Sequence, residues 1–210
     1  INSKSFWKYD FFVNSDVLDP RPETELMIEK ILELFPLKEK KLRILDMCTG
    51  SGCIAITLAK EYPNSIIIAT DISLKAIEIA KYNAKELKCE NRVNFISCDL
   101  INRIDKFDIV VCNPPYLSNI EYNKTSLEIQ KYEPKIALVG LKEGYDFYYR
   151  ISKILPKLLD INSRAFIEIG ALQAKKTIDI FKLENIDLMD LITDIQNHDR
   201  LLILKKTWKL

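Results

Sequence analysis

Short, continuous apolar runs alternate along this chain with longer stretches of helical character. Leu42 to Met47 is predicted as a buried strand, and Ser65 to Thr70 has the continuous apolar run of a strand covered on both faces. Val93 to Cys98 and Phe107 to Cys112 are predicted as further strands. Helices are predicted between them at Cys53 to Tyr62 and, with clear amphipathic spacing, at Ser73 to Lys88. Because strands and helices alternate in units of roughly 25 to 30 residues, the sequence predicts an α/β fold with a doubly wound, mostly parallel sheet and helices on both faces.

The N-terminal part of the chain precedes this alternation. Phe6 to Val13 is aromatic and β-prone and is followed by a turn-like Asn-Ser-Asp, which predicts a short strand or hairpin. Pro20 and Pro22 exclude helix before Pro22 but suit a first helical turn there. A helix is therefore predicted from Pro22 to about Phe35.

Beyond Asn113 the pattern loosens into a region rich in Tyr, Glu and Lys. Three elements are predicted after it: a helix from Gly144 to Asp160 that contains Pro156, a strand from Arg164 to Ile169 and a helix from Ala171 to Phe181. Two last strand-like runs, Ile186 to Ile195 and Arg200 to Lys205, are joined by Gln-Asn-His-Asp. That spacing predicts an antiparallel hairpin at the edge of the sheet.

The composition excludes several classes of protein. Of the 210 residues, 48 % are hydrophobic and 29 % charged, so the chain is not disordered. No stretch approaches the roughly 18 apolar residues of a membrane span. The net charge of +1 argues against a dominant phosphate-binding face. The five cysteines are scattered and never spaced C-x2-C, which predicts reduced thiols and no metal site.

The chain contains only five glycines, and two of them, Gly50 and Gly52, lie in the turn after the strand Leu42 to Met47. Ligands of open α/β sheets bind outside the carboxyl ends of strands, where glycine lets the backbone approach a ligand closely. Gly50-x-Gly52-x-x-Ala55 satisfies the dinucleotide-binding pattern, and Asp71 at the end of the next strand can bind ribose hydroxyls. These features fit a nicotinamide dinucleotide and S-adenosylmethionine equally well.

A second motif, Asn113-Pro114-Pro115-Tyr116, follows the strand Phe107 to Cys112. The prolines remove two backbone donors and leave carbonyls that only accept hydrogen bonds. The Oδ1 atom of Asn113 and the carbonyl of Pro114 could accept both hydrogens of a planar NH2 group, while Tyr116 stacks on its face. Such a nitrogen is a poor nucleophile, so alignment with a sulfonium methyl group is the help that it needs.

These motifs, in this order, resemble those of class I S-adenosylmethionine-dependent methyltransferases that act on planar NH2 nitrogens. Three further stretches are similar to the release factor glutamine methyltransferases (the PrmC/HemK family): Asp19-Pro20-Arg21-Pro22-Glu23-Thr24-Glu25, Tyr132-Glu133-Pro134, and Phe166-Ile167-Glu168-Ile169-Gly170 with Gln173. The resemblance covers the chain from about Phe6 to Leu204. It implies a Rossmann-like class I methyltransferase fold with a mostly parallel seven-stranded sheet, a C-terminal antiparallel hairpin and a short N-terminal β-hairpin.

The resemblance also implies a site and a reaction. The residues expected around S-adenosylmethionine are Cys48, Thr49, Gly50, Ser51 and Gly52 at its methionine part, Asp71 at its ribose, Asp99 and Leu100 beside its adenine, and Asn113. The residues expected around the substrate are Asn113, Pro114, Pro115 and Tyr116, with Asn113, Pro114 and Tyr116 catalytic. That substrate is the glutamine in the Gly-Gly-Gln loop of peptide chain release factors, methylated on its side-chain nitrogen without a metal, with S-adenosyl-L-homocysteine as the product. The expected enzyme is a cytoplasmic monomer.

The sequence departs from the family pattern in several places. Cys48 stands where the family usually has glycine, and Leu100 occupies a position that is often aromatic. The expected division is an N-terminal hairpin and linker over residues 1–20 and a methyltransferase domain over residues 21–210. The 210 residues do not include the small helical N-terminal domain with which the family helps grip the release factor. Because the sequence begins at Ile1 and not at Met, we expect that this domain was cut off or lies elsewhere in a longer polypeptide, and that the fragment alone binds its protein substrate weakly.

Two other functions compete with this interpretation. An amino-group methyltransferase acting on DNA or RNA bases would share the Asn113 to Tyr116 motif, but the net charge of +1 and the Asp19 to Glu25 segment argue against it. A nicotinamide-binding oxidoreductase would explain Gly50, Gly52 and Asp71 but gives no role to Asn113 to Tyr116.

Overall fold

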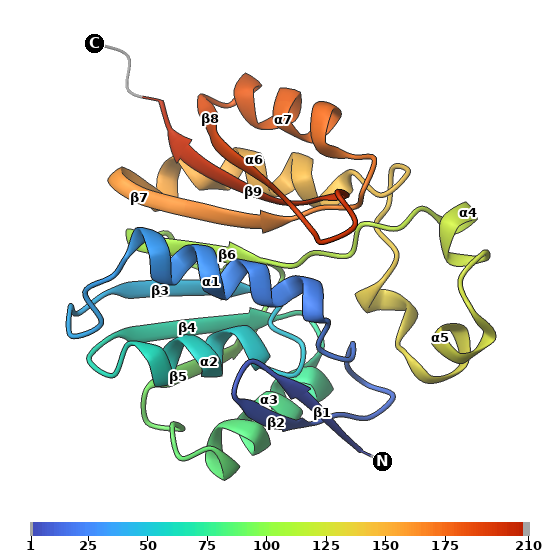
Figure 1. The fold of residues 1–210 in the computed structure, drawn as a ribbon, viewed down its shortest axis with the longest axis horizontal. Coiled ribbons are helices and arrows are strands. Elements are labelled where there is room, and N and C mark those ends of the chain that lie inside the picture. Colours follow the sequence, from blue (N-terminus) through green and yellow to red (C-terminus); the bar gives the residue numbers. More distant parts are fainter. Residues whose placement is uncertain (1, 208–210) are drawn as a thin grey trace.

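The computed structural model describes residues 2–207, which form one α/β fold around a seven-stranded sheet (Figure 1). The strand order is β5-β4-β3-β6-β7-β9-β8. The strands are β3 (Arg43–Met47), β4 (Ile66–Asp71), β5 (Val93–Ser97), β6 (Phe107–Cys112), β7 (Leu159–Glu168), β8 (Ile186–Thr193) and β9 (Asp199–Lys206). β3 to β7 are parallel, and β9 lies antiparallel between β7 and β8. The predicted fold class, with its C-terminal hairpin, is confirmed.

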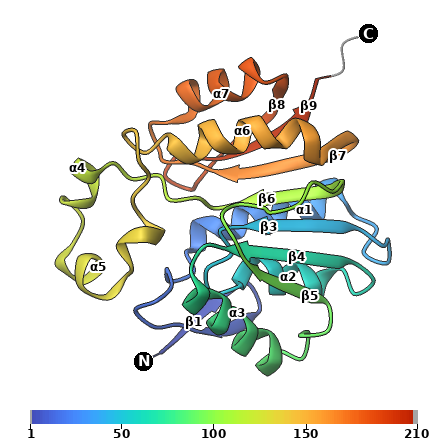
Figure 2. The ribbon, with the colours of Figure 1, turned by 180° about the vertical axis from the view of Figure 1, so that it is seen from behind.

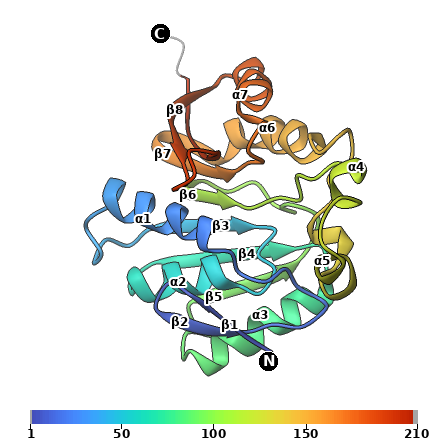
Figure 3. The ribbon, with the colours of Figure 1, turned by 45° about the vertical axis from the view of Figure 1, so that its right-hand side comes forward.

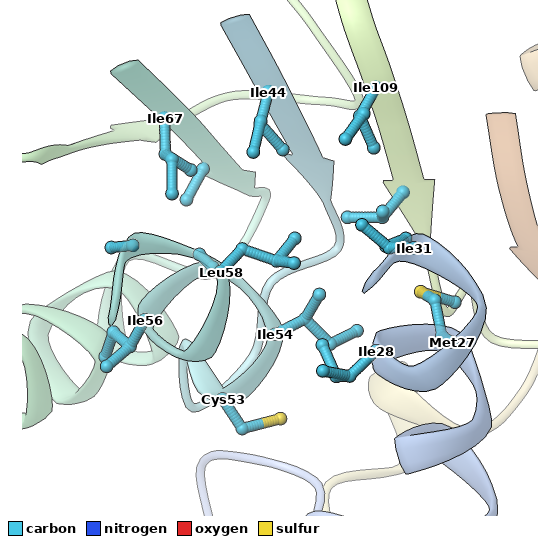
Figure 4. Packing of buried hydrophobic residues seen from close by; sticks show 14 of the residues in the cluster. Met27, Ile28, Ile31, Ile44, Cys53, Ile54, Ile56, Leu58, Ile67 and Ile109 are labelled. Carbon is cyan, nitrogen blue, oxygen red and sulfur yellow. The ribbon is translucent and has the colours of Figure 1, made fainter. Parts of the chain in front are cut away.

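Helices cover both faces of this sheet (Figures 1 and 2). One face carries α1 (Glu25–Leu34), α2 (Cys53–Glu61) and α3 (Leu74–Glu86), and the other carries α6 (Asp146–Leu158) and α7 (Ala174–Leu183). Successive strand residues enter different cores: Ile44 packs with α1 and α2, and Leu45 packs with α6. Figure 4 shows Ile44, Ile67 and Ile109 facing α1 and α2. Burial on both faces explains why these strands are continuously apolar.

A two-stranded hairpin of β1 (Ser3–Phe6) and β2 (Tyr9–Phe12) lies outside the main sheet, as predicted. Phe6 and Phe11 are fully buried and meet edge to face. Asn83 of α3 exchanges hydrogen bonds with the backbone of Phe12 and also donates to the carbonyl of Ser51 in the turn after β3. One buried amide therefore joins the hairpin, α3 and that turn.

Three boundaries in the C-terminal part differ from the sequence prediction. β7 begins at Leu159 instead of Arg164, and α6 ends at Leu158 instead of Asp160, because the chain becomes extended at Leu159 and enters the strand directly. α7 begins at Ala174 instead of Ala171. There the side chain of Gln173 accepts a hydrogen bond from the amide of Gly170 and donates one to the carbonyl of Tyr116, which holds residues 170–173 in a turn.

The loosely patterned region after Asn113 forms a small lobe beyond the carboxyl ends of the strands (Figure 3). It contains α4 (Asn119–Tyr122), α5 (Leu127–Tyr132) and the 3-10 helix η2 (Lys135–Ala137). The Nη2 atom of Arg21 lies 2.6 Å from both carboxylate oxygens of Glu133, which ties this lobe to the segment before α1. Glu133 is thereby fixed next to the segment that precedes α1.

Candidate active site

A cavity of about 330 Å³ opens at the carboxyl ends of β3, β4, β5 and β6. Its walls are completed by residues 16–21 before α1, by residues 136–141 of the lobe and by the first turns of α6. Eight of the predicted cofactor residues line it: Cys48, Thr49, Gly50, Ser51, Asp71, Asp99, Leu100 and Asn113. The parallel sheet therefore brings together side chains from four separate strand ends, as the sequence predicts.

The turn after β3 is built around the buried carboxylate of Asp46. Its Oδ2 atom accepts hydrogen bonds from the hydroxyl of Thr49 at 2.6 Å and from the amide of Ala55 at 3.2 Å. Its Oδ1 atom has no hydrogen-bond partner among the described residues. Burial raises the pKa of Asp46 to about 7, although the two donors oppose that rise. This carboxylate fixes the start of α2 beneath the cavity.

The two glycines of this turn have different roles. Gly50 has φ +54° and a Cβ added there would meet no atom within 4 Å, so its missing side chain leaves cavity space open. Gly52 does not line the cavity. It has φ +81°, and an added Cβ would lie 3.0 Å from the Cβ of Ala80 and the Cδ1 of Ile56. Gly52 is therefore required by backbone conformation and by packing against α3.

Asp71, at the end of β4, is held toward the cavity by backbone donors. Its Oδ2 accepts from the amide of Gly50 and its Oδ1 from the amide of Ser73, both at 2.9 Å. Burial raises the pKa of this carboxyl, and the donated amide hydrogen bonds oppose the rise. Each oxygen keeps a lone pair for a further donor, which suits the two hydroxyls of a ribose.

The far side of the cavity contains Asp99 and Leu100. Asp99 pairs with Arg150 of α6 at 2.5 Å, and that guanidinium lies 5.3 Å from the ring centroid of Phe147. Phe147 is the one aromatic residue among the described cavity-lining residues. Leu100 has φ +56° and Cys48 has φ +60°, a region that favours glycine. This conformation gives a physical reason for the glycine that the family resemblance implies at the position of Cys48.

The predicted substrate loop follows β6. Asn113 and Pro115 line the cavity, whereas Pro114 and Tyr116 are not part of its described lining. The hydroxyl of Tyr116 is directed toward Glu168, 3.4 Å from its Oε1 atom. Burial raises the pKa of Tyr116, so this phenol is neutral and able to donate.

Glycines from the lobe pack tightly against this loop. A Cβ on Gly140 would come 2.6 Å from the carbonyl oxygen of Pro115, and one on Gly144 would come 2.1 Å from that of Tyr116. The backbone carbonyls of Pro115 and Tyr116 are thus packed directly against these two glycines. The sequence singled out neither contact, because the residues are far apart along the chain.

Sequence reasoning assigned no role to several residues around this site. Thr24, from the first turn before α1, lies between Asn113 and Glu168, and Arg150 and Phe147 enter from α6. Thr24 occupies the N-cap position of α1 yet makes no capping hydrogen bond. The family-like segments Asp19 to Glu25 and Phe166 to Gly170 were the available signal, since Thr24 and Glu168 belong to them.

The charge of the cavity also bears on its ligand. Its described lining contains five aspartates and two arginines: Asp16, Asp19, Asp71, Asp99, Asp146, Arg21 and Arg150. This acidic balance suits S-adenosylmethionine, which carries a net positive charge, better than the two phosphates of a nicotinamide dinucleotide. Within residues 2–207, no group of three or more His, Cys, Asp or Glu side chains could hold a metal ion, and no helix is long and apolar enough to cross a membrane.

The sequence and the fold match known methyltransferases. A family model described as the methyltransferase small domain matches residues 18–130. The chain is 38 % identical to a release factor glutamine methyltransferase from Clostridium acetobutylicum, over 94 % of this chain and 70 % of that protein. It is 36 % identical to a bifunctional methyltransferase from Rickettsia prowazekii, over 96 % of this chain but only 43 % of that protein's length.

Solved structures agree at the level of the fold. A ribosomal protein L11 methylase from Lactobacillus delbrueckii subsp. bulgaricus superposes with a TM-score of 0.65 at 20 % identity, over 91 % of this chain and 84 % of that one. An S-adenosylmethionine-dependent methyltransferase from Agrobacterium tumefaciens gives 0.63 at 14 % identity, over 99 % and 70 %.

The sheet with one reversed strand, the glycine turn after β3 and the cavity at the strand ends define a Rossmann-like, class I methyltransferase. S-Adenosylmethionine is the methyl donor that this class implies. Within that class, the chain belongs to the release factor glutamine methyltransferase family. The predicted family and enzyme class are thereby confirmed.

Proposed function

We propose that this chain transfers a methyl group from S-adenosylmethionine to the side-chain amide nitrogen of the glutamine in the Gly-Gly-Gln loop of peptide chain release factors. The observation that carries the proposal is the position of Asn113. It follows β6 directly and lines the same cavity as Gly50 and Asp71. An amide that can hold a planar NH2 group therefore lies beside the residues assigned to the cofactor.

The cofactor assignment follows from the cavity lining. Asp71 would bind the ribose hydroxyls, and the backbone of Cys48 to Ser51 would contact the methionine part across the open space at Gly50. Phe147 offers an aromatic face in the region of Asp99 and Leu100, where the usual aromatic residue is replaced by leucine. When bound, the cofactor supplies an electrophilic sulfonium methyl group.

The residues after β6 would bind and orient the nucleophile. The Oδ1 atom of Asn113 and the carbonyl of Pro114 accept the two amide hydrogens of the substrate glutamine, which holds its nitrogen in line with the methyl group. The tight packing of Gly140 and Gly144 keeps this loop in place. After transfer the extra amide proton leaves to solvent or to a nearby carbonyl. Tyr116 keeps its proposed role as the ring beside the substrate.

The remaining assignments belong to the same proposal. We assign residues 21–210 to the methyltransferase domain and residues 1–20 to a hairpin and linker, of which residues 16–20 line the cavity; residue 1 and residues 208–210 lie outside the described residues. The enzyme acts in the cytoplasm, where release factors work, and as a monomer. Light scattering after size-exclusion chromatography tests the monomer directly.

The decisive experiment is incubation of the chain with S-adenosylmethionine and a full-length release factor, followed by mass spectrometry of the peptide that contains Gly-Gly-Gln. We expect one added methyl group on the glutamine. A release factor with that glutamine replaced by alanine is the matched control and should gain none. If the chain methylates an oligonucleotide and not the release factor, the acceptor is an amino group of a nucleic acid base and the proposed protein substrate is wrong.

A further inference from the structure

Hydrogen bonds join three polar side chains at the wall of the cavity: Asn113 and Thr24 line it, and Glu168 lies behind them. The Nδ2 atom of Asn113 lies 3.3 Å from the Oγ1 atom of Thr24, and that hydroxyl donates to Oε2 of Glu168 at 2.7 Å. Thr24 and Glu168 are only 3 % and 4 % exposed. Asn113 and Glu168 follow or end neighbouring strands, since Cys112 pairs with Ile167. Neither Thr24 nor Glu168 has a role in the reaction described above.

The number of donor hydrogens on these side chains determines which group donates in each of their hydrogen bonds. An ionised carboxylate only accepts hydrogen bonds, so Thr24 and Tyr116 must both donate to Glu168. Thr24 has a single proton, and once that proton points to Glu168 only lone pairs remain toward Asn113. Asn113 must then present its NH2 group to Thr24. Because the amide is planar, its Oδ1 atom faces the other way.

We propose that Glu168, acting through Thr24, is a positioning residue that makes Asn113 present its oxygen to the NH2 group of the substrate. This inference rests on the proposed function, because the orientation matters only if the substrate group is a hydrogen-bond donor. Glu168 touches neither substrate nor cofactor in this scheme. Its effect is to exclude the flipped amide, in which two NH2 groups would face each other.

The protonation state of Glu168 decides between the two orientations. A protonated Glu168 can donate to Thr24, which frees the Thr24 proton for Oδ1 of Asn113 and turns the amide around. Burial raises the pKa of Glu168 to about 7, so both states are accessible near neutral pH. The titratable and charged groups that face Glu168 are Glu23, Cys53, Tyr116, Tyr148 and Arg200.

The first test compares Glu168→Gln with the wild-type enzyme in methylation of a release factor. The amide of the new glutamine can donate to Thr24 and so favours the flipped Asn113. We expect kcat to fall by about tenfold to a hundredfold, the loss typical of one charged hydrogen bond, while the Kd for S-adenosylhomocysteine stays unchanged. A Glu168→Gln enzyme with wild-type kcat overturns the proposal.

A second pair of variants separates orientation from packing. Thr24→Val keeps the shape of the side chain and removes its hydroxyl, so it should lose activity as Glu168→Gln does. Thr24→Ser keeps the hydroxyl and should retain the activity of the wild-type enzyme. Thr177→Val is the matched control, because the buried hydroxyl of Thr177 has no hydrogen-bond partner among the described residues. Equal losses in Thr24→Ser and Thr24→Val would assign the effect to packing and reject the proposal.

A readout without turnover keeps this inference distinct from the proposed substrate. In the free protein, the side-chain NH2 resonances of Asn113 should shift with pH with a midpoint near that of Glu168, and the shift should vanish in Glu168→Gln. If the wild-type enzyme fails to methylate release factors while these resonances titrate, the substrate is wrong and the orienting chain stands. If they do not titrate with Glu168, the orienting chain is wrong whatever the substrate.

Discussion

Glu61 and Glu168 are both buried, with exposed fractions of 6 % and 4 %, but they lie at opposite ends of the sheet and have opposite kinds of partner. Glu61, at the end of α2, receives hydrogen bonds from Lys8, Lys38 and Trp7. Burial alone would raise its pKa, yet these donors lower it to about 2. Glu168 has the neutral donors Thr24 and Tyr116, and burial raises its pKa to about 7.

The difference separates two uses of a buried carboxylate. At the amino-terminal end of the sheet, two lysines compensate the charge of Glu61 and bind the hairpin to α2 and the loop before β3, which stabilises the fold. At the carboxyl end, neither Glu168 nor Asp46 receives a hydrogen bond from a cation among the described residues. Arg200 lowers the pKa of Glu168 only by electrostatic attraction, and burial leaves each carboxyl with a pKa of about 7. Their burial costs stability, but each carboxylate holds the hydroxyl of a threonine that lines the cavity, Thr24 for Glu168 and Thr49 for Asp46.

The strongest test of this division is Asn113→Ala at the carboxyl end. Loss of one positioned polar group typically lowers a rate by about 10²–10³-fold, and we expect that loss in methyl transfer with the urea midpoint unchanged. Asn64→Ala is the control and should retain full activity. Asn64 is exposed, lies in the loop before β4 and donates hydrogen bonds to Glu39. Methylation within a few fold of wild type in Asn113→Ala would remove Asn113 as the holder of the nucleophile.

Asp71→Ala should lower the affinity for the cofactor more than it lowers the stability of the fold. The lost charged hydrogen bonds are worth about 1.5–3 kcal/mol, which corresponds to an affinity for S-adenosylhomocysteine lower by about tenfold to a hundredfold. Calorimetric titration measures this directly. Asp108→Ala is the matched control, since Asp108 accepts from the amide of Arg43 at the other end of the sheet. An unchanged Kd in Asp71→Ala would take Asp71 out of the site.

The sequence predicted which strand ends meet at the cavity better than it predicted the contacts between side chains. Strand alternation determines which ends of β3, β4 and β6 meet, so Cys48, Asp71 and Asn113 could be placed at one cavity without a structure. Gly52 is predicted at the cofactor; in the structure it lies outside the described cavity lining and packs against Ala80. That role depends on how α3 crosses the turn, which periodicity does not encode.

The contacts of the buried carboxylates could not be predicted from the sequence for a similar reason. Thr24 and Glu168 are 144 residues apart, and their hydrogen bond requires both the strand order and the position of α1. Lys8 and Glu61 meet only because the hairpin packs beside α2. Such pairs are set by tertiary packing, whereas strand ends follow from local pattern and connection rules.

At the amino-terminal end, Glu61→Gln should reduce stability and leave catalysis intact. We expect the free energy of unfolding in urea to fall by about 1–3 kcal/mol, a moderate loss because Lys8 and Lys38 are 60 % and 50 % exposed and their charges are screened. Glu33→Gln is the control: Glu33 is 61 % exposed and pairs only across one helical turn with Lys30, so the change should be within about 0.5 kcal/mol. A lower kcat per folded Glu61→Gln molecule would contradict the separation of the two ends.

The pH dependence of stability should show the two carboxylates with opposite signs. Glu168 has an ordinary pKa of 4.5 when unfolded and about 7 when folded, so between these values the folded state binds more protons and its stability falls as pH rises. Glu61 has a pKa of about 2 when folded, so its contribution is present above pH 4.5 and is lost as pH falls toward 2.

Glu168→Gln and Glu61→Gln should therefore flatten different parts of the plot of the free energy of unfolding against pH. Free energies of unfolding measured in urea at a series of pH values should lose slope between about pH 4.5 and 7 in Glu168→Gln, by at most about 1.4 kcal/mol per pH unit. Asp46 retains a slope of the same sign there, so the flattening is partial. Glu61→Gln should instead flatten the acid side below about pH 4.5. If Glu168→Gln leaves the neutral slope at its wild-type value, Glu168 is ionised in both states and the contrast between the two carboxylates is lost.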